Sequence, residues 1–129
     1  MEVVAVLGAS SDPTRYSYKA IQMLQEYGHK AVPVNPREKE VLGLKVTPDL
    51  KALAQSGQKI DTLTIYVNSA ISEKYEHEII SLAPKRVIFN PGAESYALEK
   101  SLKHNGIEVE NACTLVLLRT DQFERKQPT

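Results

Sequence analysis

Residues 3–8 read Val3-Val4-Ala5-Val6-Leu7-Gly8, a continuous apolar run that a glycine stops. Such a run of β-branched residues indicates a strand covered on both faces, as strands are in a parallel sheet. A helical apolar stripe follows and ends at Gly28; its members are Ala20, Ile21, Leu24 and Tyr27. This part of the sequence therefore predicts one strand followed by one helix.

The same alternation continues along the chain. Strands are expected over 31–35, 61–67 and 86–90, with a fifth beginning at Ile107. One helix is expected after Thr47 as N-cap, with Pro48 in its first turn. A second is expected behind the start signals Ser72 and Glu73. A third is expected over 97–102 and ends at Asn105-Gly106. Pro33 cannot donate to a ladder, which predicts an outer position for the second strand. Residues 113–123 fit both a strand and a short helix.

Strands and helices at this spacing indicate βαβ units. We therefore expect an α/β fold with a doubly wound, mostly parallel, five-stranded, Rossmann-like sheet in three layers. A single domain is expected over residues 1–123, followed by a polar tail over 124–129.

Composition narrows the possible partners. The 129 residues carry sixteen basic and sixteen acidic side chains, so no net charge attracts nucleic acid or an anionic membrane. One cysteine cannot form an intramolecular disulfide, and the first residues lack the features of a signal peptide. No apolar run approaches the roughly 20 residues of a membrane span. We therefore expect a cytoplasmic protein whose ligand is a small molecule.

The loop after the first predicted strand reads Gly8-Ala9-Ser10-Ser11-Asp12-Pro13. A dinucleotide-binding fold carries G-x-G-x-x-G here, and only the first glycine is present, since Ser10 and Pro13 stand at the other two positions. Hydroxyl groups and a cation are available to an anion at the helix N-terminus; they belong to Ser10, Ser11, Thr14, Ser17 and Arg15. The alternative is a loop of caps and turns.

The second predicted strand ends in Asn35-Pro36-Arg37. An NAD-binding fold needs an acidic residue in this region for the ribose 2′-hydroxyl. The acid is missing and a guanidinium is present, which suits a phosphate. By itself the segment favours a solvated basic turn within the mixed-charge run 37–40, which also contains Lys39. Together with the first loop, it favours a phosphorylated nucleotide.

Four motifs now resemble a known family, the stand-alone CoA-binding proteins, which look like the nucleotide-binding domain of the succinyl-CoA synthetase alpha subunit. They are V-A-V-L-G-A-S at 4–10, V-P-V-N-P-R at 32–37, V-L-G-L-K-V at 41–46 and N-P-G-A-E at 90–94. The resemblance implies that coenzyme A or an acyl-CoA binds with its pyrophosphate at 8–17. Its 3′-phosphate would lie near Arg37, and its adenine and pantetheine would pass Val67.

The residues expected to bind the cofactor are Gly8, Ala9, Ser10, Ser11, Arg15, Tyr16, Ser17, Asn35, Pro36, Arg37, Val67, Asn68, Asn90, Pro91 and Gly92. The last three stand where the thioester end or a second substrate would lie. Related chains often carry proline or arginine where this one has Asn68-Ser69. The synthetases also use a phosphorylated histidine in a second domain that is not in this sequence. The resemblance therefore implies binding and leaves catalysis and any protein partner open.

No catalytic residue or metal site is assigned. Glu94 is either a base or a favourable acid at a helix N-terminus, and Cys113 is expected to be a small buried residue. His29 and His104 are expected at helix C-termini, where an imidazolium is favourable. The alternatives to CoA binding are a nicotinamide-dinucleotide-binding oxidoreductase or redox-sensing domain, and an interaction module that has lost its ligand.

Overall fold

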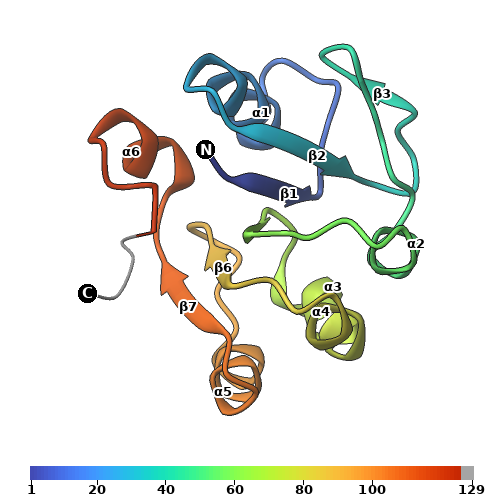
Figure 1. The fold of residues 1–129 in the computed structure, drawn as a ribbon, viewed down its shortest axis with the longest axis vertical. Helices are drawn as coiled ribbons and strands as arrows, with labels where there is room; N and C mark the ends of the chain where they lie inside the picture. The colour runs from blue at the N-terminus through green and yellow to red at the C-terminus, as the bar shows by residue number, and fades with distance from the viewer. Residues whose placement is uncertain (126–129) are drawn as a thin grey trace.

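A computed structural model describes residues 1–125 of the protein. Its strands are β1 (Val3–Leu7), β2 (Lys30–Val34), β3 (Glu40–Val41), β4 (Leu44–Lys45), β5 (Thr62–Ile65), β6 (Arg86–Phe89) and β7 (Glu108–Asn111). Its helices are α1 (Tyr16–Glu26), α2 (Leu50–Gln55), α3 (Ser69–Ser72), α4 (Glu76–Leu82), α5 (Tyr96–His104) and α6 (Thr114–Arg119), with a 3₁₀ turn, η1 (Glu73–Tyr75), between α3 and α4. Figure 1 shows these elements around a central sheet.

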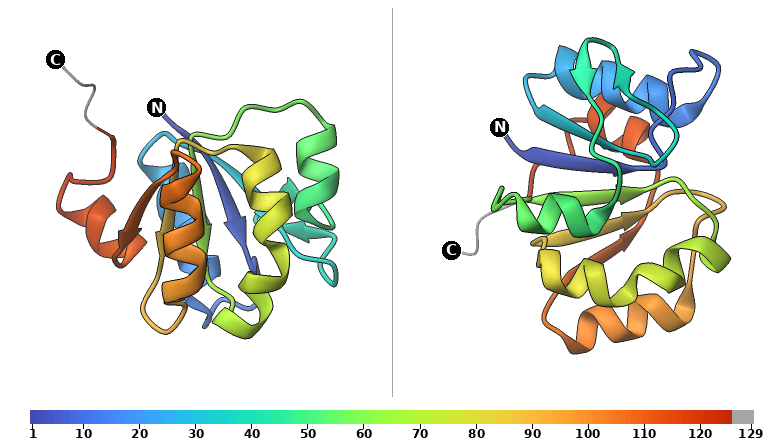
Figure 2. Two further views of the ribbon diagram at one scale, coloured as in Figure 1. Left: turned by 90° about the horizontal axis from the view of Figure 1, so that it is seen from below. Right: turned by 90° about the vertical axis from the view of Figure 1, so that its right-hand side faces the viewer.

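Five strands form the sheet in the order β2-β1-β5-β6-β7, and every pair is parallel. Helices α1 and α6 lie on one face, and α2, α4 and α5 lie on the other, which gives three layers (Figure 2). The expected α/β Rossmann-like fold is confirmed. β2 is the end strand of this sheet, as the proline at position 33 predicts.

A single parallel bridge extends the sheet beyond β2. Thr47 pairs with Val34, its amide donates to the Pro33 carbonyl (2.9 Å), and the Asn35 amide donates to the Thr47 carbonyl (3.0 Å). Counting this bridge as a reduced strand gives the order 3-2-1-4-5-6 of a Rossmann sheet. The hairpin of β3 and β4 connects β2 to this bridge along the chain, and the sequence did not predict it.

Two apolar layers cover the sheet, one on each face. The larger one packs Leu53 of α2, Ile79 of α4 and Leu98 of α5 against the strands. The other packs Ile21 of α1 and Leu118 of α6 against the opposite face. Burial on both faces is the reason β1 reads as a continuous apolar run rather than an alternating one.

Several predicted helix boundaries are wrong. The N-cap of α2 is Asp49, whose Oδ1 accepts from the Ala52 amide (2.8 Å), because Thr47 is held in the bridge to β2. The helical segment after β5 begins at Ser69 behind the N-cap Asn68, earlier than Ser72. Residues 113–123 fit a strand or a helix by sequence, and within them residues 114–119 form α6. Of the predicted tail, residues 126–129 lie outside the described residues.

The amino ends of the strands enclose a buried ionic cluster. Arg86 is 1% exposed, its Nε donates to the Thr62 hydroxyl (3.1 Å), and its terminal nitrogens contact carboxylates of Glu2 (3.4 Å) and Glu110 (3.2 Å). The prediction of an imidazolium at His29 is wrong. Its Nδ1 accepts a hydrogen bond from the Glu2 amide (3.0 Å), and burial lowers its pKa. The ring is therefore neutral.

In the described part of the chain, we find no helix that is both long enough and apolar enough to cross a membrane.

Candidate ligand-binding site

The carboxyl ends of the strands carry the candidate site. β1 lies between β2 and β5, so the strand order reverses where β1 meets β5. In open parallel sheets the loops diverge at such a switch point and leave a crevice for a ligand. Here the two loops are residues 8–15 after β1 and residues 66–68 after β5. The site is therefore expected between these loops.

Gly8 lets the two loops meet. Its φ is +91°, and a Cβ built on it would lie 2.9 Å from Cγ1 of Val67 and 3.5 Å from Cβ of Tyr66. No other residue satisfies both conditions without strain, since a side chain both clashes there and disfavours this conformation. The glycine that the sequence indicates for a tight turn is thus also needed for packing between β1 and β5.

A cavity of about 380 Å³ opens at this point. It is lined by Gly8, Ser10, Arg15, Tyr16, Ser17, Asn35, Tyr66, Val67 and Pro91. Eight of these nine were expected from the sequence; Tyr66 was not. The N-terminus of α1 also opens here, and neither a side-chain cap nor an acidic residue occupies its first turn. A helix N-terminus with the adjacent Arg15 guanidinium favours an anion.

Several polar groups of the first loop are already paired within the protein. The amides of Gly8 and Ala9 both donate to the Val34 carbonyl, at 3.0 and 3.3 Å. The Ser11 amide donates to the Glu38 carboxylate, so a negative group already lies on this loop. Ser11 itself does not line the cavity. An anion bound here would thus meet chiefly the Ser10 hydroxyl, Arg15 and the start of α1.

Asn35 positions the loops rather than offering a free amide. Its Nδ2 donates to the Ala9 carbonyl (2.7 Å), and its Oδ1 accepts from the Arg37 amide (2.8 Å). The Arg37 side chain is exposed, lies outside the cavity lining, and makes no ion pair with residues 1–125. Its guanidinium is therefore available to a group that extends out of the cavity beyond β2.

Two further asparagines expected at the site hold elements together. Asn68 caps α3 through its Oδ1. Asn90 is 2% exposed, and its amide donates to the Thr64 hydroxyl (2.6 Å) and the Ile65 carbonyl (3.0 Å) while its Oδ1 accepts from the Thr114 amide (2.9 Å). Gly92 lies outside both cavities at this edge, and its amide donates to the Glu94 carboxylate (2.9 Å).

A second cavity of about 250 Å³ continues the first toward β7 and shares with it Tyr16, Tyr66 and Pro91. Its remaining lining is Asn90, Cys113 and Leu115. Cys113 is half-buried, which differs from the expected buried residue. The Tyr66 hydroxyl is buried and has no hydrogen-bond partner in residues 1–125, although Thr64 and Thr114 hydroxyls are near. Burial raises the pKa of this phenol, so it stays protonated.

Sequence reasoning missed Tyr66, Cys113 and Leu115. The only available signal for Tyr66 was its position at the end of the β5 run. Cys113 and Leu115 lie in residues 113–123, which fit both a strand and a short helix by sequence. Their place at the site follows from β7 being next to β6 in the sheet.

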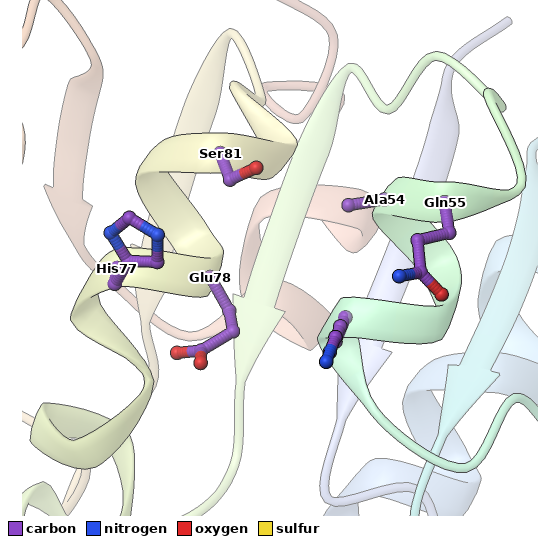
Figure 3. Close-up of a pocket in the computed structure, with 6 residues that line it drawn as sticks. Ala54, Gln55, His77, Glu78 and Ser81 are labelled. Carbon is purple, nitrogen blue, oxygen red and sulfur yellow. The ribbon is translucent and has the colours of Figure 1, made fainter.

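A larger hollow, of about 420 Å³, lies between α2 and α4 on the flank of the molecule. Figure 3 shows Ala54 and Gln55 on α2 facing Glu78 and Ser81 on α4 across it. Its lining includes Lys51 and His77 in the first turns of α2 and α4 but no glycine turn, and the Asp49 side chain caps the N-terminus of α2. The features that hold phosphate are therefore at the sheet edge and not here.

Comparison with known proteins shows the family of this chain. The family model for the CoA binding domain matches residues 2–119, so the chain belongs to the CoA-binding domain family. Over 51 residues, 39% of this chain, it is 45% identical to the alpha subunit of an ADP-forming acetate–CoA ligase II from Pyrococcus furiosus. Over 50 residues, also 39% of the chain, it is 38% identical to the uncharacterized protein YneT of Bacillus subtilis.

These two matches span 11% of the ligase subunit and 37% of the Bacillus protein. A crystal structure of an uncharacterized protein superimposes with a TM-score of 0.86 at 38% identity, covering 95% of this chain and 98% of that one. The fold thus occurs in a protein of nearly the same extent, and a related segment occurs within a much longer ligase subunit.

Proposed function

We propose that this protein binds coenzyme A or an acyl-CoA along the carboxyl edge of its sheet. The pyrophosphate lies at the cavity formed by residues 8–17, the adenosine 3′-phosphate lies at Arg37, and the pantetheine passes Val67 toward residues 90–92. No catalytic step is assigned to the described residues. The observation that carries the proposal is the uncapped N-terminus of α1 opening beside Arg15 into a cavity at the topological switch point.

The arrangement of charges supports CoA over a nicotinamide dinucleotide. The exposed Arg37 stands where an NAD-binding fold needs an acid for the ribose hydroxyl. Ser10 lines the cavity at the position where the dinucleotide fingerprint has its second glycine. A phosphate on the adenosine ribose matches a guanidinium, whereas the ribose of NAD offers it no charged partner.

The direct test compares ligands by thermal unfolding. A ligand that binds only the folded state raises Tm in proportion to the logarithm of its concentration over Kd. We expect CoA to raise Tm clearly, and NAD at the same concentration to leave it nearly unchanged. Stabilisation by NAD and not by CoA would overturn the proposal.

The role of Arg37 is tested by a double comparison in calorimetry. Because this side chain is exposed, Arg37→Ala should weaken CoA about tenfold at low ionic strength, the lower end for a charge-assisted contact. Dephospho-CoA lacks the 3′-phosphate, and its affinity should hardly change. Arg15→Ala should weaken both ligands alike, because both retain the pyrophosphate.

Lys39→Ala removes a neighbouring exposed cation and is the matched control. If Arg37→Ala weakens both ligands equally, or if Lys39→Ala alone discriminates between them, the 3′-phosphate contact is not at Arg37.

A further inference from the structure

The loops at the carboxyl edge follow one another in a definite order. From β2 to β7 they present Arg37, then Gly8 with Arg15, then Tyr66, then Asn90, and finally Cys113. Neighbouring strands lie about 4.8 Å apart, so this edge spans about 19 Å. An acyl-CoA carries its groups in a similar order: 3′-phosphate, pyrophosphate, pantetheine, thioester and acyl chain. A ligand held by its phosphates near β1 and β2 thus directs its other end toward β6 and β7.

The chemistry of the cavity changes along this edge. The cavity near β1 offers hydroxyl groups, a guanidinium and a helix N-terminus. The second cavity, which we call the distal pocket, is walled by Tyr16, Pro91, Cys113 and Leu115 together with Tyr66 and Asn90. Asn90 offers it little polarity, since its amide nitrogen and oxygen are hydrogen-bonded inside the protein. The distal pocket is therefore mainly apolar.

Tyr66 marks the junction between the two cavities, because it lines both of them. Its hydroxyl is buried beside the hydroxyls of Thr64 and Thr114, so it adds no exposed polar group to the pocket. An acyl chain that passes this junction would therefore meet the apolar part of the wall.

We propose that the distal pocket holds the acyl group of a short aliphatic acyl-CoA. This inference rests on the proposed function and adds the class of ligand to it. At about 250 Å³ the pocket lies below the range of pockets that enclose drug-sized ligands, which fits a short chain and not a long fatty acyl group.

The experiment is calorimetric titration of the whole protein with CoA and with acetyl-, butanoyl- and hexanoyl-CoA. Each methylene that enters the pocket should tighten binding about fourfold, until the pocket is full. Equal affinity for CoA and all three thioesters would overturn the inference while leaving CoA binding intact. If none of the four ligands binds, the proposed function itself is overturned.

Variants locate the effect. Leu115→Trp fills the distal pocket and should bring the ratio of butanoyl-CoA to CoA affinity close to one. Val116→Trp is the matched control on the same helix, since Val116 is 50% exposed and does not line the pocket. It should keep the wild-type ratio. A ratio that is the same in the two variants would place the acyl group elsewhere.

Leu115 is buried, so its variant carries a risk of unfolding. The thioester series on the wild-type protein needs no variant, so it tests the inference even if Leu115→Trp does not fold.

Discussion

Gly8 combines two constraints, a positive φ and a close approach, and a comparison with Gly92 separates them. Gly92 has the same φ of +91° but nothing within 4 Å of a built Cβ, whereas at Gly8 that atom would meet Val67 at 2.9 Å. Gly92→Ala should cost about 1–2 kcal/mol of unfolding free energy, from backbone strain alone. Gly8→Ala should cost about 1–3 kcal/mol more, from overpacking. Urea denaturation of both variants measures the difference, and equal losses would mean that Val67 moves aside freely.

At the scale of single residues, sequence patterns identified Gly8 because only one residue type serves such a turn. Asn35 and Asn90, which the sequence indicates as ligand-binding residues, line the two cavities, but their polar atoms are paired inside the protein. Which of several partners an amide takes depends on contacts between loops that are distant in the chain. Tyr66 was missed for the same reason, since its place at two cavities depends on what β6 and β7 bring beside it.

At the scale of elements, a buried polar network joins β5, β6 and α6. The hydroxyls of Thr64 and Thr114 lie 2.8 Å apart, and Asn90 bonds to both residues. Asn90→Leu keeps a side chain of similar size but leaves the Thr114 amide buried without its acceptor. We expect a loss of about 2–4 kcal/mol in unfolding free energy, measured by urea denaturation.

Asn68→Ala is the matched control for this network. Asn68 also follows a strand, but it is exposed and caps only the short α3. Asn68→Ala should lower the unfolding free energy by about 1 kcal/mol, as the loss of an ordinary N-cap does. If Asn90→Leu costs no more than Asn68→Ala, the network does not fix α6 to the sheet.

The order and type of the main elements followed from periodicity, because burial on both faces gives strands and helices distinct patterns. Boundaries failed where one residue had two possible roles. Thr47 is a good N-cap by type, yet its backbone is held by β2, and Asp49 caps α2 instead. Residues 114–119 were undecided because six residues are too few for a period to show.

At the scale of the whole molecule, the two ends of the sheet are built differently. The amino ends hold a buried polar cluster of Glu2, Thr62 and Arg86, with the Phe123 ring 4.7 Å from the Arg86 guanidinium. The carboxyl ends leave two adjoining cavities open. Conditions that disturb the amino end should therefore change stability without acting directly on the candidate site.

His29 makes this separation measurable through pH. Burial lowers its pKa below the ordinary value of 6.5, with smaller opposing effects from the carboxylates of Glu124 and Glu2. As pH falls below about 6.5, His29 therefore takes up a proton in the unfolded state before it does so in the folded state. Its contribution to the unfolding free energy is fully present above that pH and is lost as pH falls to the pKa of the folded state. The unfolding free energy should thus decrease between pH 7 and pH 5.

Urea denaturation across this range tests the assignment. The carboxyl groups of Asp61 and Glu99 have pKa values below their ordinary 3.8 and 4.5, so their contributions are lost only at lower pH. His29→Asn keeps an acceptor for the Glu2 amide and should flatten the profile between pH 7 and pH 5. His77→Asn with His104→Asn changes only exposed imidazoles and should leave the slope unchanged. A slope that survives His29→Asn would show that another group carries the proton.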